Sequence, residues 1–126
     1  MKATLAAGAT ATSKFTIDRE RTIDFMGEKA RVYATPMLVR DVEVACRDLI
    51  AAQLDPGEDS VGTRIELDHL APTPMGMLVE IVVTIAEVKG RAVTLDFEGR
   101  DSVEVICRGK HQRFVVDLIK TEARLA

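Results

Sequence analysis

The sequence predicts an α+β fold in which a curved antiparallel sheet of about five strands wraps around one long central helix. Residues 36–54 have a broad apolar arc, which is typical of an enclosed helix. The segments that follow turn and alternate as antiparallel strands do, and one shorter alternating segment precedes the helix. One helix cannot cover both faces of such a sheet, so a sheet that curves around it is the economical arrangement.

The chain before the helix is weakly patterned. Residues 1–13 are small and weakly patterned, and we expect a loose N-terminal arm. Residues 14–25 alternate in part, which predicts a strand with a turn or bulge around residues 18–21. Residues 26–31 hold a glycine and three charges and predict a loop.

The helix has clear start and stop signals. Thr35 and Pro36 are typical of a helix start, with threonine as the N-cap and proline at the first helical position. No glycine and no further proline interrupts residues 36–54. The Asp-Pro-Gly sequence at residues 55–57 ends the helix.

The sequence pattern after residue 57 predicts a series of strands. Residues 60–70 alternate weakly, residues 77–88 are apolar on both parities, and residues 93–98 alternate cleanly. A final long strand covers residues 103–116. Because residues 77–88 are apolar on both sides, we expect one sheet face to need cover from a second copy or from loops.

This order of elements predicts a hotdog-type fold, as a single domain over residues 1–126. The main alternative from the pattern alone is another combination of one helix and a curved sheet, such as a cystatin-like cone.

Composition excludes several classes of partner. A formal net charge of −3 argues against a general polyanion binder, and 4% aromatic residues argue against base-stacking platforms for nucleic acid. No stretch reaches the length of about 20 apolar residues that a membrane span needs. Cys46 and Cys107 have neither CxxC nor zinc spacing, which favours a reduced, cytoplasmic protein, with one disulfide as the minor alternative.

A polar stripe on the helix is the first candidate site. Arg40, Glu43 and Arg47 are spaced by three and four residues. The ordinary interpretation is a solvated face on which Glu43 and Arg47 form a helix ion pair. The functional interpretation is a cleft in which Glu43 acts as a base or a nucleophile.

Thr35 and the two histidines have ordinary interpretations as well. Thr35 is explained as an N-cap, although a hydroxyl at a helix start can also hold a ligand oxygen. His69 and His111 are most simply surface or hydrogen-bonded residues, and two histidines without a third ligand motif make a weak case for metal. The sequence contains no GxSxG, P-loop or GxGxxG motif.

Three segments together resemble a known family. VYATPMLVRDVEVAC, LDPGEDSVGTRIELDHLAPTPMG and RGKHQR are similar to the fluoroacetyl-CoA thioesterase-like family of hotdog proteins. The resemblance runs from about residue 32 to residue 116 and needs no gap across the six matched positions. Those positions are Thr35, Glu43, Gly62, His69, His111 and Arg113.

The resemblance implies an acyl-CoA thioesterase that acts as a homodimer, or a higher oligomer, and uses no cofactor beyond the CoA of its substrate. The implied catalytic residues are Thr35, Glu43 and His69. The implied substrate-binding residues are Gly62, Arg113 and His111. In such dimers the site is shared, so Thr35 and Glu43 face His69 of either chain.

The implied substrate is a short- or medium-chain acyl-CoA. Fluoroacetyl specificity in the family accompanies an aromatic-rich lid before the helix, and residues 25–33 offer only Phe25 and Tyr33. This argues against fluoroacetyl-CoA itself. Two alternatives stay open: a non-enzymatic hotdog protein that binds an acyl or CoA-like ligand, and a purely structural dimer module.

Overall fold

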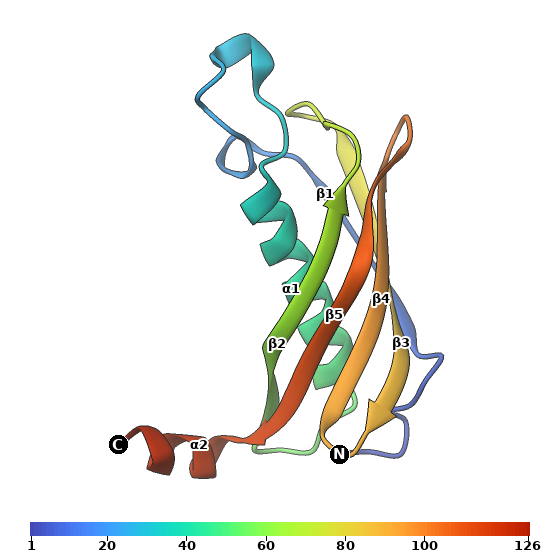
Figure 1. Ribbon diagram of the computed structural model, residues 1–126, viewed down its shortest axis with the longest axis vertical. Helices are drawn as coiled ribbons and strands as arrows, with labels where there is room; N and C mark the ends of the chain where they lie inside the picture. The colour runs from blue at the N-terminus through green and yellow to red at the C-terminus, as the bar shows by residue number, and fades with distance from the viewer.

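The computed structural model describes residues 1–126 and has one helix lying against a five-stranded, all-antiparallel sheet (Figure 1). The elements are β1 (Thr10–Thr16), η1 (Arg19–Arg21), η2 (Glu28–Ala30), α1 (Thr35–Ala51), β2 (Glu58–His69), β3 (Leu78–Lys89), β4 (Ala92–Asp101), β5 (Val105–Asp117) and α2 (Leu118–Leu125). The strand order in space is β1-β3-β4-β5-β2. The predicted α+β class with about five strands around a helix is confirmed.

The core lies between α1 and the sheet face that it covers. Leu38, Val42, Cys46 and Ile50 repeat at every fourth position of α1 and are fully buried. On β3 the alternate residues from Val79 to Ile85 are buried as well, and the two sets belong to one hydrophobic cluster. The buried residues of α1 recur about once per helical turn, and those of β3 recur at every second position, so each set forms one continuous apolar stripe. The two stripes pack lengthwise against each other.

The opposite face of the sheet does not need the apolar cover that the sequence suggested. Its central strands carry mostly charged and polar side chains, including Glu80 and Thr84 on β3. Lys110 Nζ on β5 and Asp96 Oδ1 on β4 form an ion pair 2.7 Å long on this face. The apolar residues Leu78 and Val82 are scattered among these groups, so the expectation was wrong.

The expectation of a loose arm over residues 1–13 was also wrong. Leu5 is buried in the core, and Thr10 already belongs to β1. The amide of Lys2 donates to the carbonyl of Gln53 at 2.9 Å, and the terminal amine lies 2.7 Å from Asp55 Oδ2. These are main-chain and terminal contacts, which leave no periodic pattern in the sequence.

The remaining differences lie at element ends. After β1 the chain leaves the sheet, so residues 22–25 make only an isolated bridge from Thr22 to Tyr33 instead of a strand. The 17-residue α1 stops at Ala51, before the predicted end at residue 54. The short helix α2 was not predicted; the Asp117 side chain caps it by accepting from the Lys120 amide at 2.9 Å. Figure 1 shows α2 projecting from the end of the sheet opposite the segment that precedes α1.

Candidate active site

The start of α1 and the end of β2 meet at a threonine and a histidine. The N-cap of α1 is Ala34 rather than Thr35, so the predicted capping role of Thr35 is wrong. Thr35 is instead the first helical residue, and its Oγ1 lies 2.8 Å from Nδ1 of His69, the last residue of β2. This hydroxyl–imidazole pair joins residues that are far apart in the sequence.

His69 is held in a way that favours its neutral form. Burial lowers the pKa of His69, while the backbone of Ala71 acts in the opposite direction. Its Nε2 is buried without a hydrogen-bond partner. The Tyr33 ring meets the imidazole edge to face, with 6.3 Å between ring centroids. A neutral imidazole can take up a proton during a reaction.

A cavity of about 340 Å³ opens beside this pair and is lined by both Thr35 and His69. Ile23, Phe25 and Val32, from the segment before α1, form one apolar part of its wall. The chain after His69 forms the other part. A polar pair at the edge of an apolar cavity suits a ligand with an apolar group next to a reactive polar one.

Glu43 belongs to a second cluster, farther along α1. Its Oε1 lies 4.0 Å from Nε2 of His111 on β5. A Cβ at Gly62 on β2 would be 2.8 Å from the same Oε1 and 3.2 Å from Cε1 of His111. The missing side chain of Gly62 therefore leaves the space in which the Glu43 carboxylate lies. The helix ion pair expected between Glu43 and Arg47 does not form, because Arg47 pairs with Asp59 at 2.6 Å.

Arg113 is buried beside Glu43 and has no carboxylate at ion-pair distance. Its Nε donates to the Ser60 hydroxyl at 2.8 Å, and its Nη2 donates to the Ser60 carbonyl at 2.7 Å. Burial lowers the pKa of Arg113, and the negative charge of Glu43 opposes that shift. Sequence reasoning missed Ser60, which looks like an ordinary strand residue and gave no signal of its own.

The contacts of His111 fix which of its nitrogens carries the proton. Nδ1 lies 2.8 Å from the Arg64 carbonyl, which can only accept, so Nδ1 is the donor. Nε2 then accepts from Nη1 of Arg113 at 3.1 Å. Burial lowers the pKa of His111, and the charge of Arg113 acts in the same direction while the Arg64 backbone opposes it. His111 is therefore a neutral group between Arg113 and Glu43.

One chain thus brings the six predicted residues together as two clusters rather than one. Thr35 and His69 form the first, and Glu43, Gly62, His111 and Arg113 form the second. Thr35 and Glu43 are two turns apart on α1, roughly 12 Å along the axis at about 1.5 Å per residue. No three His, Cys, Asp or Glu side chains converge as a metal site would require, and Cys46 and Cys107 are free and buried.

Comparison with known proteins decides the family. The model of the fluoroacetyl-CoA-specific thioesterase family matches residues 17–118, which include both clusters. The chain belongs to this family. The fluoroacetyl-CoA thioesterase of Streptantibioticus cattleyicolor is 32% identical over 132 aligned residues, which cover 99% of this chain and 95% of that protein.

Solved structures agree with this assignment. A threonine-to-serine mutant of the fluoroacetyl-CoA thioesterase, in complex with acetyl-CoA, has a TM-score of 0.86 and 31% identity, over 94% of this chain and 95% of that one. A hot-dog-like protein from Thermanaerovibrio acidaminovorans has a TM-score of 0.88 and 23% identity, over 97% of this chain and 92% of that one. The hotdog fold and the assignment as a thioester hydrolase are therefore confirmed for this member of the family. None of its helices is long and apolar enough to cross a bilayer.

Proposed function

We propose that this thioesterase hydrolyses a short- or medium-chain acyl-CoA to the free acid and CoA. The observation that carries the proposal is the Thr35–His69 pair at the edge of an apolar cavity of about 340 Å³. The acyl group occupies the cavity, and the thioester carbonyl lies beside the hydroxyl and the imidazole. A relative solved with acetyl-CoA supports a small acyl group.

Fluoroacetyl-CoA is not the substrate that this cavity favours. Its aromatic lining consists of Phe25 and Tyr33 besides His69, and the Tyr33 hydroxyl is already engaged by Asp41. The Phe25 ring is 79% exposed and does not close the cavity. Apart from Thr35, the other wall positions are aliphatic, which suits a plain hydrocarbon chain.

In the proposed hydrolysis a water oxygen forms a bond to the thioester carbonyl carbon, and the carbonyl oxygen becomes an oxyanion. Collapse of this intermediate breaks the carbon–sulfur bond and releases the CoA thiolate, which takes up a proton. Glu43 either removes the proton from the water or attacks the carbonyl itself, in which case water cleaves the resulting anhydride. Thr35 lies at the positive end of α1, where a hydroxyl and the helix dipole stabilise negative charge.

The gap between the two clusters supports a site built by two chains. Glu43 of one copy would complete the Thr35–His69 pair of the other. β2 is an outermost strand of the sheet, so its free edge is open to pairing with a second copy. We therefore propose a homodimer, and the two reduced cysteines support a cytoplasmic location.

Release of free thiol from a panel of acyl-CoA esters tests the proposal. Glu43→Ala should lower kcat by at least about 10²-fold, the low end for a general base. Asp48→Ala, an exposed carboxylate on the same helix, is the matched control and should leave kcat unchanged. Transfer of ¹⁸O from labelled water into Glu43 in a single turnover would identify the carboxylate as the nucleophile.

Binding without hydrolysis is the outcome that would contradict the proposed substrate class. An acyl-CoA ester that binds, releases no thiol and has an affinity that Glu43→Gln does not change is a ligand and not the substrate. Turnover of a short- or medium-chain ester that disappears in Glu43→Gln is the expected result, and no turnover of any such ester would contradict the proposal.

A further inference from the structure

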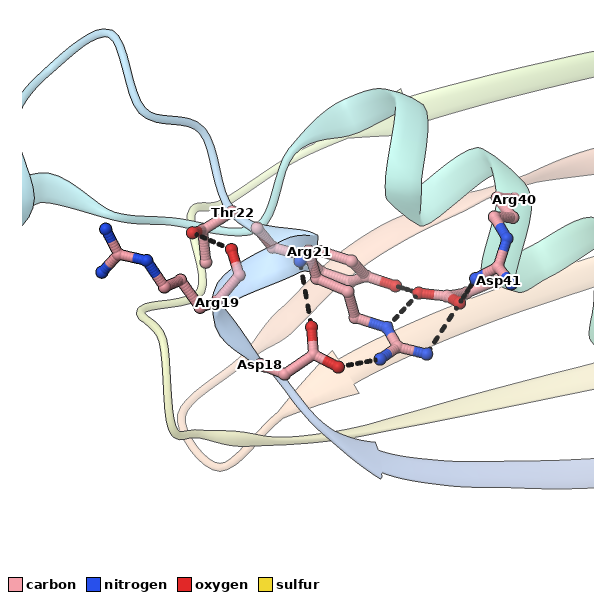
Figure 2. Close-up of polar contacts among 7 residues, drawn as sticks. Asp18, Arg19, Arg21, Thr22, Arg40 and Asp41 are labelled. Atoms are coloured by element: carbon pink, nitrogen blue, oxygen red, sulfur yellow. Dashed lines mark hydrogen bonds and ion pairs between the residues drawn. The ribbon is translucent and has the colours of Figure 1, made fainter.

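A buried carboxylate ties the segment before α1 to the helix. Asp41 on α1 is 7% exposed. Arg21 donates to both of its oxygens, from Nε to Oδ2 at 2.8 Å and from Nη2 to Oδ1 at 3.1 Å (Figure 2). The Tyr33 hydroxyl donates to the same Oδ2. The Arg21–Asp41 pair lies outside both clusters of the candidate site, and neither the motifs nor the family resemblance gave it a role.

Two further contacts hold the Arg21 side chain in place. Its Nη1 pairs with Asp18 Oδ2 at 2.7 Å, as Figure 2 also shows. Its guanidinium carbon lies 4.7 Å from the centroid of the Phe15 ring on β1. The negative charge of Asp41 is thus matched by a cation that cannot easily turn away, which is the condition under which a buried carboxylate is tolerated.

Tyr33 connects this network to the Thr35–His69 pair. Its ring is 2% exposed and packs edge to face against two rings. Phe15 is 6.2 Å away at an interplanar angle of 75°, and His69 is 6.3 Å away at 79°. Two sets of contacts therefore connect α1 to the His69 imidazole. One is direct, through the Thr35 hydroxyl, and the other is indirect, from Asp41 through Tyr33.

We propose that Tyr33, held by Asp41, is a positioning residue that fixes the His69 imidazole against Thr35. The inference rests on the proposed role of His69 in thioester hydrolysis. The Thr35 contact constrains one ring nitrogen, but it leaves the imidazole free to swing about that hydrogen bond. The Tyr33 ring blocks this swing, and the bond to Asp41 stops Tyr33 itself from tilting away.

Two substitutions weaken or remove the hydrogen bond between Tyr33 and Asp41 without removing an aromatic ring. Tyr33→Phe deletes only the hydroxyl, and Asp41→Asn replaces the charged acceptor by a neutral one of the same shape. Because small displacements of a reacting group can cost up to about 10²-fold, each variant should lower kcat by about three- to tenfold and change KM by less than about twofold. Restoring the hydroxyl with a fluorotyrosine at position 33 should restore kcat.

A control variant tests whether a loss of stability alone would lower kcat. Ile85→Val removes one methylene from the sheet core, away from the network, and is expected to lower the melting temperature. It should leave kcat and KM unchanged. If Tyr33→Phe and Asp41→Asn behave as Ile85→Val does, losing stability with normal kcat, the network is structural only and the proposal is wrong.

A spectroscopic readout separates this proposal from the proposed function. Tyr33 is the only tyrosine and the chain has no tryptophan, so ultraviolet absorbance and fluorescence report on this one ring. Burial first, and then the bond to Asp41, raise the pKa of Tyr33 well above its ordinary value. Asp41→Asn should therefore let the phenol ionise at lower pH.

The imidazole itself is followed by the ¹⁵N and ¹H signals of its ring. Tyr33→Phe should shift or broaden the His69 signals while those of His111 stay in place. This result is expected even if no acyl-CoA ester is hydrolysed, a case in which only the proposed function fails. Unchanged His69 signals in both variants would overturn the positioning role, whatever the enzyme turns over.

Discussion

Residue 62 decides where the carboxylate of Glu43 lies. An alanine there would bring its Cβ to 2.8 Å from Glu43 Oε1, a separation that requires the carboxylate to move. The φ of Gly62 is not positive, so the backbone tolerates alanine and the conflict is confined to the side chains. Gly62→Ala should lower kcat for acyl-CoA hydrolysis by about tenfold, since displacement of a general base weakens proton transfer.

A second strand glycine provides the control for that measurement. A Cβ at Gly99 would lie 2.7 Å from Sγ of Cys107, so Gly99→Ala has a similar conflict in a different place. It should lower the melting temperature and leave kcat unchanged. Equal losses of kcat in the two variants would mean that Gly62 has no specific relation to Glu43.

The two histidines make stability depend on pH in one direction. Burial lowers the pKa of both His69 and His111 from the ordinary value of 6.5, so the unfolded chain takes up protons before the folded one does. Their contribution is complete above the unfolded pKa of 6.5 and is lost as pH falls from there through the lowered folded pKa values. Urea unfolding should give a lower free energy at about pH 5.5 than at about pH 7.5.

A double variant isolates the histidine contribution. With His69→Gln and His111→Gln the free energy of unfolding should change much less over the same pH range. The carboxylates with lowered pKa values, such as Glu28 at about 2, lose their contribution only at more acidic pH. A slope that persists in the double variant would contradict the assignment to these histidines.

The sequence could identify the residues of the candidate site but not their contacts. Glu43 and His69 stood out through their chemical type and the family resemblance, and both lie in polar clusters. Thr35 has a cap-like position in the sequence, yet its hydroxyl bonds across to His69. Ser60 gave no signal, and Tyr33 stood out only as one of two aromatic residues before the helix, because their contacts depend on how distant strands and α1 meet.

At the scale of elements, strong periodicity gave correct predictions and irregular segments did not. The four-residue repeat of α1 and the alternation of β4 reflect burial on one side, so a single sequence reveals them. The N-terminal segment binds mainly through main-chain groups and a single buried side chain, Leu5. The short α2 buries no residue at all, so it has no core-facing stripe to detect.

The N-terminal segment should therefore contribute to stability despite its featureless sequence. Leu5 is 6% exposed and belongs to the main hydrophobic cluster. Leu5→Ala should lower the free energy of unfolding by about 2–4 kcal/mol, as truncation of a buried leucine does. Ile119→Ala on α2, where the side chain is 77% exposed, should change it by less than about 0.5 kcal/mol. Equal effects in chemical denaturation would mean that Leu5 does not pack as the structure indicates.

At the scale of the whole molecule, the open question is how Glu43 reaches the Thr35–His69 pair. Their separation along α1 argues that one chain supplies Glu43 and a second chain supplies Thr35 and His69. Two inactive variants, Glu43→Gln and His69→Ala, test this when they are unfolded, mixed and refolded together. In a mixed dimer one of the two sites would then be free of both substitutions.

The expected recovery follows from random assembly. Equal amounts of the two variants give mixed dimers in about half of the population, and each mixed dimer has one intact site out of two. The mixture should therefore regain roughly a quarter of the wild-type kcat per chain, while each variant alone stays inactive. Sedimentation should show a species of twice the 13.8 kDa chain mass. A dimer that regains no activity would place Glu43 and His69 of each site in the same chain, and would require α1 or β2 to move during catalysis.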